Sequence, residues 1–372
     1  MSGKRIIFIA AAAFSLLLAG CTAPAQYGEL TKIAPYLYEV NYYDMDDAAF
    51  DAVQPVGAQA ACSSVRNGAF HGRNLDLFYN ESAEVVVHMA AGKDRFASLA
   101  VCGGVPQIND ERLASGDETA FAKLPLLSMD GINENSVAVN VNVVPAVDHA
   151  SPTGTNPGAR RIYLGVAPRY ILNHAKSARH ALELLEGLDL YGGFGDDFSL
   201  HLMISDPEET LIVEFIDNKI VYRAGAREDS GNVMTNLFTT ELPAYTPHSE
   251  GIERHEMLTA NYASGCTEEG MTELMKSVKY SQTYEPETDP FWYSEANGVG
   301  IKADGTPYDT NIDTPHEVVM ERMQSSFDAY KRHERKGEFW QTVNTSIYNI
   351  DEQSLLLFVQ EDYDHPYRFT LK

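Results

Sequence analysis

Apolar and polar residues alternate along much of the chain, and a period of two is typical of strands with one buried face. The alternation is clearest in residues 136–144, where valine occupies every second position from Val137 to Val143. Residues 30–43 are rich in tyrosine, leucine and valine and predict an extended segment. The pattern predicts further strands at 69–77, 83–90, 96–102, 200–205, 210–215, 219–224, 340–349, 354–360 and 367–371.

A helical spacing replaces the alternation in a few places. Five apolar residues recur at the positions of one buried helix face: Ala178, Ala181, Leu182, Leu185 and Leu188. We expect further helices at 247–262, 267–280 and 314–336, and a short one at 46–53. Because strands and helices occur in separate blocks, the pattern predicts an α+β fold with antiparallel sheets and not a doubly wound parallel sheet.

The first 21 residues have the features of an export signal. Lys4 and Arg5 precede an apolar stretch, Ile6–Leu18, which is too short for a standard membrane span. The following Leu-Ala-Gly-Cys sequence matches the bacterial lipoprotein cleavage box, which predicts cleavage before Cys21 and a lipid on its sulfur. The alternative is an ordinary secretory signal with an unrelated cysteine. In both cases we expect export, and a lipid would hold the protein on the extracytoplasmic face of a bacterial cell membrane.

Length and composition limit the classes of function. The chain has 372 residues, of which 44% are hydrophobic, enough for a large buried core. Its net charge of −25 repels phosphate backbones, so we expect no nucleic-acid partner. Besides Cys21, the chain contains Cys62, Cys102 and Cys266. The sequence allows either a Cys102–Cys266 disulfide or three free thiols. It contains no CxxC or HExxH motif, so we expect no metal site and no cofactor.

Cys62 is the strongest candidate for chemistry. It opens the sequence Cys-Ser-Ser-Val, and the run Gly72–Asp76 (Gly-Arg-Asn-Leu-Asp) follows ten residues later. A cysteine nucleophile needs charged neighbours, because the thiolate is the attacking form and nearby positive charge lowers the thiol pKa. Arg73 and Asp76 are three residues apart and would lie on opposite faces of a regular strand, so one of them needs a bend or bulge to reach the sulfur. The alternative is an inert buried thiol beside a surface ion pair.

The segment from Cys62 to Asp76 resembles the opening of the choloylglycine hydrolase family of N-terminal-nucleophile (Ntn) amidases, which includes bile salt hydrolases and penicillin V acylases. Further segments similar to the family follow in the same order: 130–134, 137–142, 201–206, 212–215, 233–236, 253–255 and 340–348. The resemblance implies a four-layer αββα sandwich of two antiparallel sheets. It also implies an enzyme without a cofactor that hydrolyses a linear, non-peptide C–N amide bond.

The resemblance assigns roles around the nucleophile. Cys62 would attack the amide carbonyl, and its own α-amine, with a typical pKa of about 7.7–8, would act as base and then as acid. Arg73 and Asp76 would hold the thiolate and the amine, with Asp76 accepting a hydrogen bond from the ammonium. This chemistry requires Cys62 to become the first residue, so the Ala61–Cys62 bond must be cut.

The remaining site residues come from later segments. The resemblance implies that Asn236 and Asn142 shape the oxyanion site and that Arg254 adds positive charge. Asn140 is an alternative to Asn142, because residues two apart on a strand face the same side. The four residues after Asn236 (Leu-Phe-Thr-Thr) depart from the Ser-Pro usual in bile salt hydrolases, so the resemblance does not fix bile salts or penicillin as the substrate.

The position of Cys62 predicts four parts: a signal peptide at 1–20, a tether at 21–29, a pro-segment at 30–61 and a catalytic domain at 62–372. This layout resembles the acid ceramidase and isopenicillin acyltransferase branches, which cut themselves before the cysteine. After the cut, the lipid on Cys21 would remain on the pro-segment. We therefore predict that Leu30–Tyr43 packs against the catalytic part as an added strand, since its apolar residues would otherwise be exposed.

These inferences predict a lipid-anchored cysteine amidase acting on a small N-acyl compound through an acyl-thioester at Cys62. Two alternatives stay open: acyl transfer to an amine by the same intermediate, and a surface lipoprotein that binds an acylated ligand without turnover. The expected partners are the small-molecule substrate and the membrane. The acyl and amine parts of the substrate and the oligomeric state, including a homo-oligomer, are left open.

Overall fold

The structure, a computed structural model, describes residues 26–53, 60–77, 82–103, 108, 110–115, 124–145, 151–193, 198–240, 249–279, 281–284, 299–301, 307–309 and 337–371. The predicted signal peptide, the lipid site at Cys21 and the predicted helix at 314–336 lie outside these residues. In the described part of the chain, no helix is both long and apolar enough to cross a membrane.

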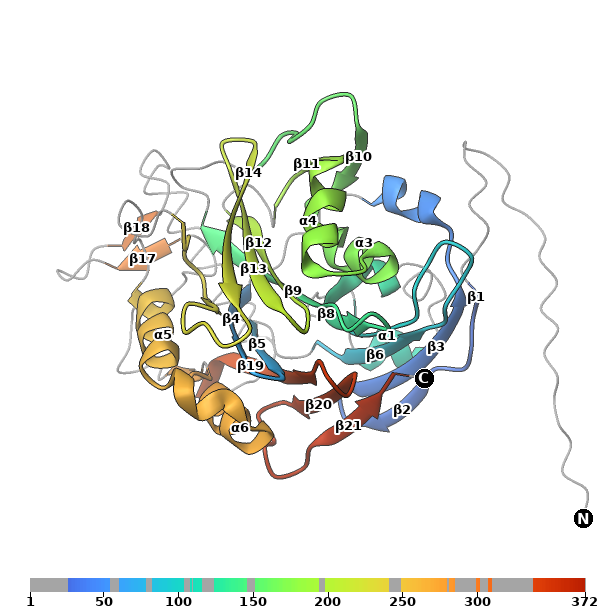
Figure 1. Cartoon of the computed structure of the whole chain (residues 1–372). Coiled ribbons are helices and arrows are strands. Elements are labelled where there is room, and N and C mark those ends of the chain that lie inside the picture. The colour runs from blue at the N-terminus through green and yellow to red at the C-terminus, as the bar shows by residue number, and fades with distance from the viewer. Residues whose placement is uncertain are drawn as a thin grey trace, which may run out of the picture.

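The larger sheet has the strand order β1-β3-β6-β7-β8-β9-β12-β13-β14, and β2 pairs with β3 (Figure 1). All its described pairs are antiparallel except β3–β6. Its strands are β1 Gln26–Tyr27, β2 Thr31–Ala34, β3 Leu37–Asp44, β6 Glu84–Met89, β7 Ser98–Cys102, β8 Ser128–Asn133, β9 Ala138–Pro145, β12 Phe198–Ser205, β13 Glu209–Ile216 and β14 Lys219–Ala226.

The smaller sheet is antiparallel in its described pairs and has the order β15-β4-β5-β19-β20-β21, with β16 paired to β19. Its strands are β4 Ala60–Asn67, β5 Phe70–Leu77, β15 Val233–Met234, β16 Ser281–Tyr284, β19 Gly337–Asn349, β20 Ser354–Val359 and β21 Tyr367–Thr370. Two short pairs lie outside both sheets: β10 Arg160–Tyr163 with β11 Leu188–Tyr191, and β17 Val299–Ile301 with β18 Pro307–Asp309.

Helices cover the outer faces of the two sheets (Figure 1). Helices α3 and α4 pack on the larger sheet, and α5 and α6 pack on the smaller one. The sheets face each other, with β4 against β9 and β19 against β8, which gives the predicted αββα layering. The helices are α1 Asp110–Ser115, α3 Ala167–His174, α4 Ala178–Glu186, α5 Ser249–Ala260 and α6 Glu268–Ser277, and the 3-10 turns are η1 Asp47–Ala52, η2 Leu124–Leu127, η3 Leu164–Val166 and η5 Tyr262–Cys266.

The alternating pattern predicted strand positions well, because the buried face of each strand is encoded by its own residues. The listed strands of both sheets are found with ends shifted by at most three residues. The listed strands do not include β1, β4, β8, β15 or β16. The sequence of β8, Ser-Met-Asp-Gly-Ile-Asn, contains two residue types that are rare in strands, aspartate and glycine. The pattern also extended the central helix too far, because α4 ends at Glu186 and Leu188 begins β11.

The predicted pro-segment is part of the larger sheet. Strand β3 pairs with β6 over six residues from Leu37 to Tyr42, and Leu37, Val40 and Tyr42 are buried. This confirms the expectation that the segment adds a strand. The pairing is parallel, contrary to the expected fully antiparallel sheets, because the chain leaves β3, forms the β4–β5 hairpin in the other sheet, and only then returns as β6.

Candidate active site

Cys62 and Arg73 lie on the β4–β5 hairpin of the smaller sheet. The hairpin turns at Gly68, whose φ of +57° belongs to the left-handed region that glycine adopts without strain. The resulting register pairs Cys62 with Leu75 and Ser64 with Arg73, so the side chains of Cys62 and Arg73 point to the same face. That face is the interior between the two sheets, where Cys62 is only 1% exposed.

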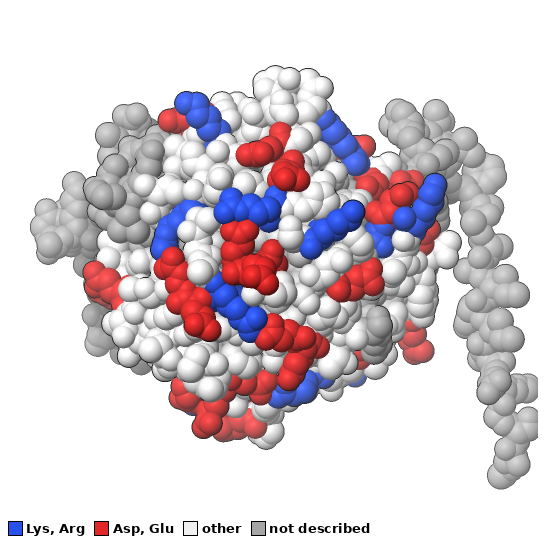
Figure 2. Space-filling view, viewed as in Figure 1, with Lys and Arg blue, Asp and Glu red and all other residues white. Residues whose placement is uncertain are grey.

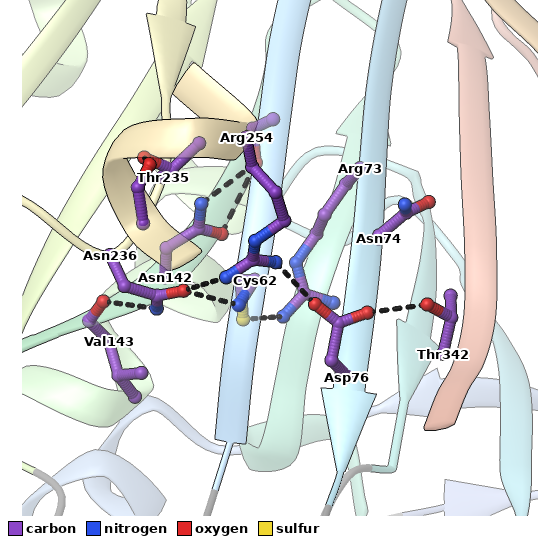
Figure 3. Close-up of polar contacts among 12 residues, drawn as sticks. Cys62, Arg73, Asn74, Asp76, Asn142, Val143, Thr235, Asn236, Arg254 and Thr342 are labelled. Atoms are coloured by element: carbon purple, nitrogen blue, oxygen red, sulfur yellow. Dashed lines mark hydrogen bonds and ion pairs between the residues drawn. The ribbon is translucent and has the colours of Figure 1, made fainter. Parts of the chain in front are cut away.

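The Arg73 guanidinium contacts the Cys62 sulfur (Figure 3) and also bonds to residues of the larger sheet. One terminal nitrogen lies 3.4 Å from Cys62 Sγ and 3.1 Å from the Val141 carbonyl oxygen of β9. The other donates to Asp130 Oδ2 of β8 at 3.0 Å. The predicted placement of an arginine beside the sulfur is therefore present, and Asp130 is its carboxylate partner.

A second chain of contacts reaches the backbone nitrogen of Cys62. This N–H donates to Asn236 Oδ1 at 3.1 Å, and the same oxygen accepts a 2.6 Å hydrogen bond from Arg254. Arg254 also forms an ion pair of 2.6 Å with Asp76 Oδ2, and Thr342 donates to Asp76 Oδ1 at 2.6 Å. Asp76 is thus connected to Cys62 through Arg254 and Asn236, and the contacts described for its carboxylate do not include the Cys62 nitrogen.

The bend or bulge expected between Arg73 and Asp76 is absent from β5, and the bulge in this region lies on the neighbouring strand β19. The β4–β5 register is regular, whereas β19 shifts between Thr342 and Asn344, opposite Asp76. The shift places the Thr342 hydroxyl on the Asp76 carboxylate. Arg73 and Asp76 therefore keep their separate faces, and each has its own arginine–carboxylate pair.

Helix α5 delivers Arg254 to Asn236. Gly251 in the first turn packs on Asn236, since an added Cβ at Gly251 would lie 3.3 Å from the Asn236 carbonyl oxygen. The Thr235 hydroxyl donates to the Gly251 carbonyl at 2.7 Å, which ties the end of β15 to the helix. Arg254, one turn further along, then meets the Asn236 side chain.

Asn142 lies on β9, the strand that packs against β4, but its side chain contacts residues other than Cys62. Its amide nitrogen donates to Ser64 Oγ at 3.1 Å and to the Met234 carbonyl at 3.3 Å. Asn140 donates to Asn142 Oδ1 at 3.0 Å, which confirms that the two asparagines share one face. Among the described contacts, neither asparagine touches the Cys62 sulfur; the backbone of the next residue, Val143, does so.

Burial dominates the electrostatics of the nucleophile. It raises the pKa of the Cys62 thiol, while Arg73 acts in the opposite direction and the nearby Asp76 carboxylate adds to the increase. Burial also raises the pKa of Asp76 to about 6, although Arg254 and the hydrogen bond from Thr342 favour its ionised form. Cys62 is therefore a neutral thiol at neutral pH and needs a base to take its proton.

The described residues include three cysteines that form no disulfide. Cys62, Cys102 and Cys266 are all free, with Cys266 exposed and Cys102 buried, so there is no Cys102–Cys266 disulfide. No group of three or more histidine, cysteine or acidic side chains in the described ranges is arranged to hold a metal ion.

Sequence reasoning missed Asp130 as a site residue. The segment 130–134 carried part of the family resemblance, but nothing in its spacing connected Asp130 to Arg73, 57 positions earlier. One signal was available, because an aspartate beside a glycine in the interior of an otherwise β-rich region is expensive to bury without a partner. Thr342 was missed for the same reason: its partner Asp76 is distant in the sequence.

No family model and no curated protein sequence matches the chain. Among solved structures, it is similar to a cysteine-to-alanine mutant of conjugated bile acid hydrolase from Clostridium perfringens, with 11% identity, a TM-score of 0.49, and coverage of 84% of this chain and 92% of that one. An arginine-to-leucine variant of the same hydrolase has 15% identity, a TM-score of 0.42, and coverage of 83% and 92%.

The chain is also similar to penicillin V acylase from Agrobacterium tumefaciens, with 15% identity, a TM-score of 0.43, and coverage of 85% of this chain and 78% of that one. These proteins are of the two kinds that the sequence resemblance names.

Proposed function

We propose that the protein is an exported cysteine amidase that creates its catalytic group by cutting its own chain between Ala61 and Cys62. The observation that carries this proposal is that two atoms of Cys62, the sulfur and the backbone nitrogen, are each held by a separate side chain. Arg73 holds its sulfur, and Asn236 holds its backbone nitrogen, in a site that is almost completely buried. A nucleophile alone needs only the first contact, whereas a nucleophile whose own nitrogen is the base needs both.

The cut itself uses groups already in place. Cys62 Sγ attacks the Ala61 carbonyl carbon, the Ala61–Cys62 C–N bond breaks, and the thiol proton passes to the departing nitrogen. The product is a thioester between Ala61 and the Cys62 sulfur, with a free α-amine on Cys62. Water then hydrolyses the thioester, leaving the Ala61 carboxylate and the free thiol of the mature enzyme.

Amide hydrolysis follows the same chemistry on a bound substrate. The α-amine takes the thiol proton, sulfur bonds to the substrate carbonyl carbon, and the carbonyl oxygen takes the electron pair. The resulting ammonium gives a proton to the leaving nitrogen as the C–N bond breaks, and water releases the acid from the thioester. Burial, which keeps Cys62 neutral, suits this cycle because the proton is transferred only when the amine is present.

Asn236 is the proposed oxyanion donor. Arg254 can only donate, so the Asn236 oxygen must face Arg254 and its nitrogen must face away. One N–H of that nitrogen donates to the Val143 carbonyl at 2.8 Å, and the second remains for a substrate oxygen. We assign Asn142 a supporting role, because its side chain bonds to Ser64, two residues after Cys62, and to Met234, two residues before Asn236.

The substrate class and location rest on the sequence. The family resemblance supports a linear, non-peptide amide of an N-acyl compound, and the residues that follow Asn236 leave the acyl group open. The Leu-Ala-Gly-Cys box supports a lipid on Cys21 and a place on the outer face of the cell membrane. With β3 bound in the larger sheet, the lipid on the pro-segment would still anchor the catalytic part after the cut.

The test is a mass spectrum of the purified protein. We expect wild type to give two chains, the second starting at Cys62, whereas Cys62→Ala stays in one chain and hydrolyses no amide. Cys266→Ala, which removes an exposed free thiol, is the matched control and should cut normally. Cleavage of Cys62→Ala before residue 62 would show that another protease makes the cut. An uncut wild-type chain with full amidase activity would disprove the role of the α-amine.

Two further outcomes separate the alternatives. A wild-type chain that remains uncut and neither hydrolyses amides nor accumulates an acyl-enzyme would support a ligand-binding lipoprotein. Formation of a new amide when a primary amine is added, faster than release of the free acid, would support acyl transfer.

A further inference from the structure

A cluster of buried charged groups lies beneath Cys62, between the two sheets. Arg73, Asp130, Glu84 and Tyr348 come from β5, β8, β6 and β19, and none has solvent exposure. The proposed chemistry uses only Arg73 from this cluster. Two acids, Asp130 and Glu84, lie near one arginine, Arg73. Burying a charge is costly unless an opposite charge balances it, so the charge state of the two acids needs an explanation.

We propose that Asp130 is a positioning residue that holds Arg73 on the Cys62 sulfur and offsets the positive charge of the arginine, so that Arg73 does not draw the buried thiol into its thiolate form. This inference rests on the proposed function, in which the α-amine and not a standing thiolate starts the reaction. Asp130 acts through Arg73, since its own contacts are with Arg73, Tyr348 and Ser346.

The Asp130 carboxylate is held in a fixed orientation. Tyr348 donates to Oδ1 at 2.5 Å, while Arg73 at 3.0 Å and Ser346 at 3.4 Å donate to Oδ2. These hydrogen bonds favour its ionised form against the burial that raises its pKa. Because β19 fixes Asp130 and Asp130 fixes one end of the guanidinium, the other end of Arg73 is directed at the sulfur and at the Val141 carbonyl.

Glu84 does not compete for this role. Burial first, and then the nearby Asp130 charge, raise the pKa of Glu84 to about 8, so it is protonated at neutral pH. Neither of its carboxyl oxygens has a hydrogen-bond partner of good geometry among the described residues, although the Asn344 amide faces it closely enough to favour ionisation. The cluster therefore holds one negative charge, Asp130, for one positive charge, Arg73.

Of the titratable groups in and around the cluster, His71, Cys102 and Tyr348 are neutral at pH 7, whereas buried Arg66, near His71, and buried Arg169, near Cys102 and Tyr348, keep their positive charge. Burial lowers the pKa of His71 to about 3 and raises that of Cys102 to about 11, and burial together with Asp130 raises the pKa of Tyr348. The Asp76–Arg254 pair on the other side of Cys62 is balanced within itself. Removing the Asp130 charge would leave Arg73 with two ionisable partners, the Cys62 sulfur and Glu84, and would favour the ionised form of each more than in wild type.

The experiment measures the pH dependence of Cys62 alkylation by iodoacetamide, with modification quantified on the Cys62 peptide by mass spectrometry so that exposed Cys266 does not contribute. Asp130→Asn keeps the shape and removes the charge. We expect its alkylation midpoint to lie lower than that of wild type by about one pH unit or more, the size of shift that an opposite charge produces. Glu84→Gln is the matched control, since it replaces a neutral acid with a neutral amide, and its profile below pH 8 should match wild type.

An Asp130→Asn midpoint equal to that of wild type overturns the proposal, as does a Glu84→Gln shift of the same size. If Asp130→Asn does not fold, Tyr348→Phe is the second test. This variant removes a hydrogen bond that stabilises the Asp130 anion, so it should lower the midpoint of Cys62 alkylation by a smaller amount. No shift in Tyr348→Phe then overturns the proposal. Alkylation needs no turnover, so this experiment tests the role of Asp130 independently of the amidase activity. Failure of the proposed function would appear instead in the mass spectrum of the chains and in the activity assay.

Discussion

At the residue scale, the site consists of two arginine–carboxylate pairs on opposite sides of one cysteine. Arg73 with Asp130 contacts the sulfur, and Arg254 with Asp76 reaches the nitrogen through Asn236. Each arginine is fixed by its carboxylate, so the groups around Cys62 are oriented before a substrate arrives. The Asp76 pair is sensitive to acid, because the pKa of Asp76 is raised to about 6.

Thr342→Val tests this pair. The Thr342 hydroxyl stabilises the Asp76 anion, so its loss raises the pKa of Asp76 further, by roughly half to one pH unit. Self-cleavage requires ionised Asp76 to hold Arg254, and its rate should therefore fall on the acid side with a midpoint near pH 6 in wild type and at higher pH in the variant. The rate is measured on freshly made precursor at a series of pH values.

Thr345→Val is the matched control for this experiment. Thr345 lies on the same strand and is buried, but it donates to Asn74 and not to Asp76. Its acid midpoint should equal that of wild type. Equal shifts in both variants would show that β19 packing, and not the Asp76 charge, sets the acid limit.

At the scale of elements, the bond proposed to be cut and the strand β3 of the predicted pro-segment lie in different sheets. The Ala61–Cys62 bond is in β4, whereas β3 is hydrogen-bonded to β6 in the larger sheet. Arg95 reinforces the end of β3, donating to the carbonyl oxygens of Tyr43 and Met45 and to the Asp44 carboxylate. Breaking the chain at residue 61 leaves all these contacts intact, so the two pieces should remain together.

Arg95→Ala should weaken that association. Charge-assisted hydrogen bonds contribute about 1.5–3 kcal/mol, so their loss should raise the dissociation constant of the two pieces by about tenfold or more. The measurement is native mass spectrometry after size-exclusion chromatography of the cut protein. Arg179→Ala, which removes an exposed pair with Glu209 inside the catalytic part, is the control and should keep both pieces. Spontaneous loss of the pro-segment from wild type would contradict the prediction.

At the scale of the whole molecule, charged residues occur both on the surface and in the buried space between the two sheets. On the face shown in Figure 2, acidic and basic side chains are interspersed, and the net charge of the chain is −25. Between the sheets, Glu84 stays protonated at neutral pH because burial raises its pKa to about 8. An acid whose pKa is raised on folding stabilises the folded state below its unfolded pKa and loses that contribution as the pH rises through the folded value.

Glu84→Gln should therefore change how stability depends on pH. In wild type, this residue should lower the free energy of unfolding by about 1.4 kcal/mol for each pH unit between its ordinary pKa of 4.5 and about 8. Urea unfolding of both proteins at pH 5.5 and 7.5 measures the difference, and the decline should be smaller in the variant. Equal declines would show that Glu84 is ionised in the folded protein at both pH values.

The sequence alone determined the local features of this protein. The alternation of apolar and polar residues located most of the longer strands of the two sheets, although not β8, and the spacing from Ala178 to Leu185 located α4. The Cys62–Arg73 contact was also predictable, because both residues lie on one hairpin whose turn and register are set within 20 residues. Such features depend on neighbours that are close in the chain.

The tertiary structure alone decided which distant residues meet. Asp130 joins Arg73 across the two sheets, Arg254 takes the Asp76 carboxylate that was expected at the amine, and Asn142 faces Ser64. The parallel placement of β3 also depends on where β6 returns. The physical reason is that periodicity records which face of an element is buried, whereas the partner on that face is chosen by the packing of the two sheets.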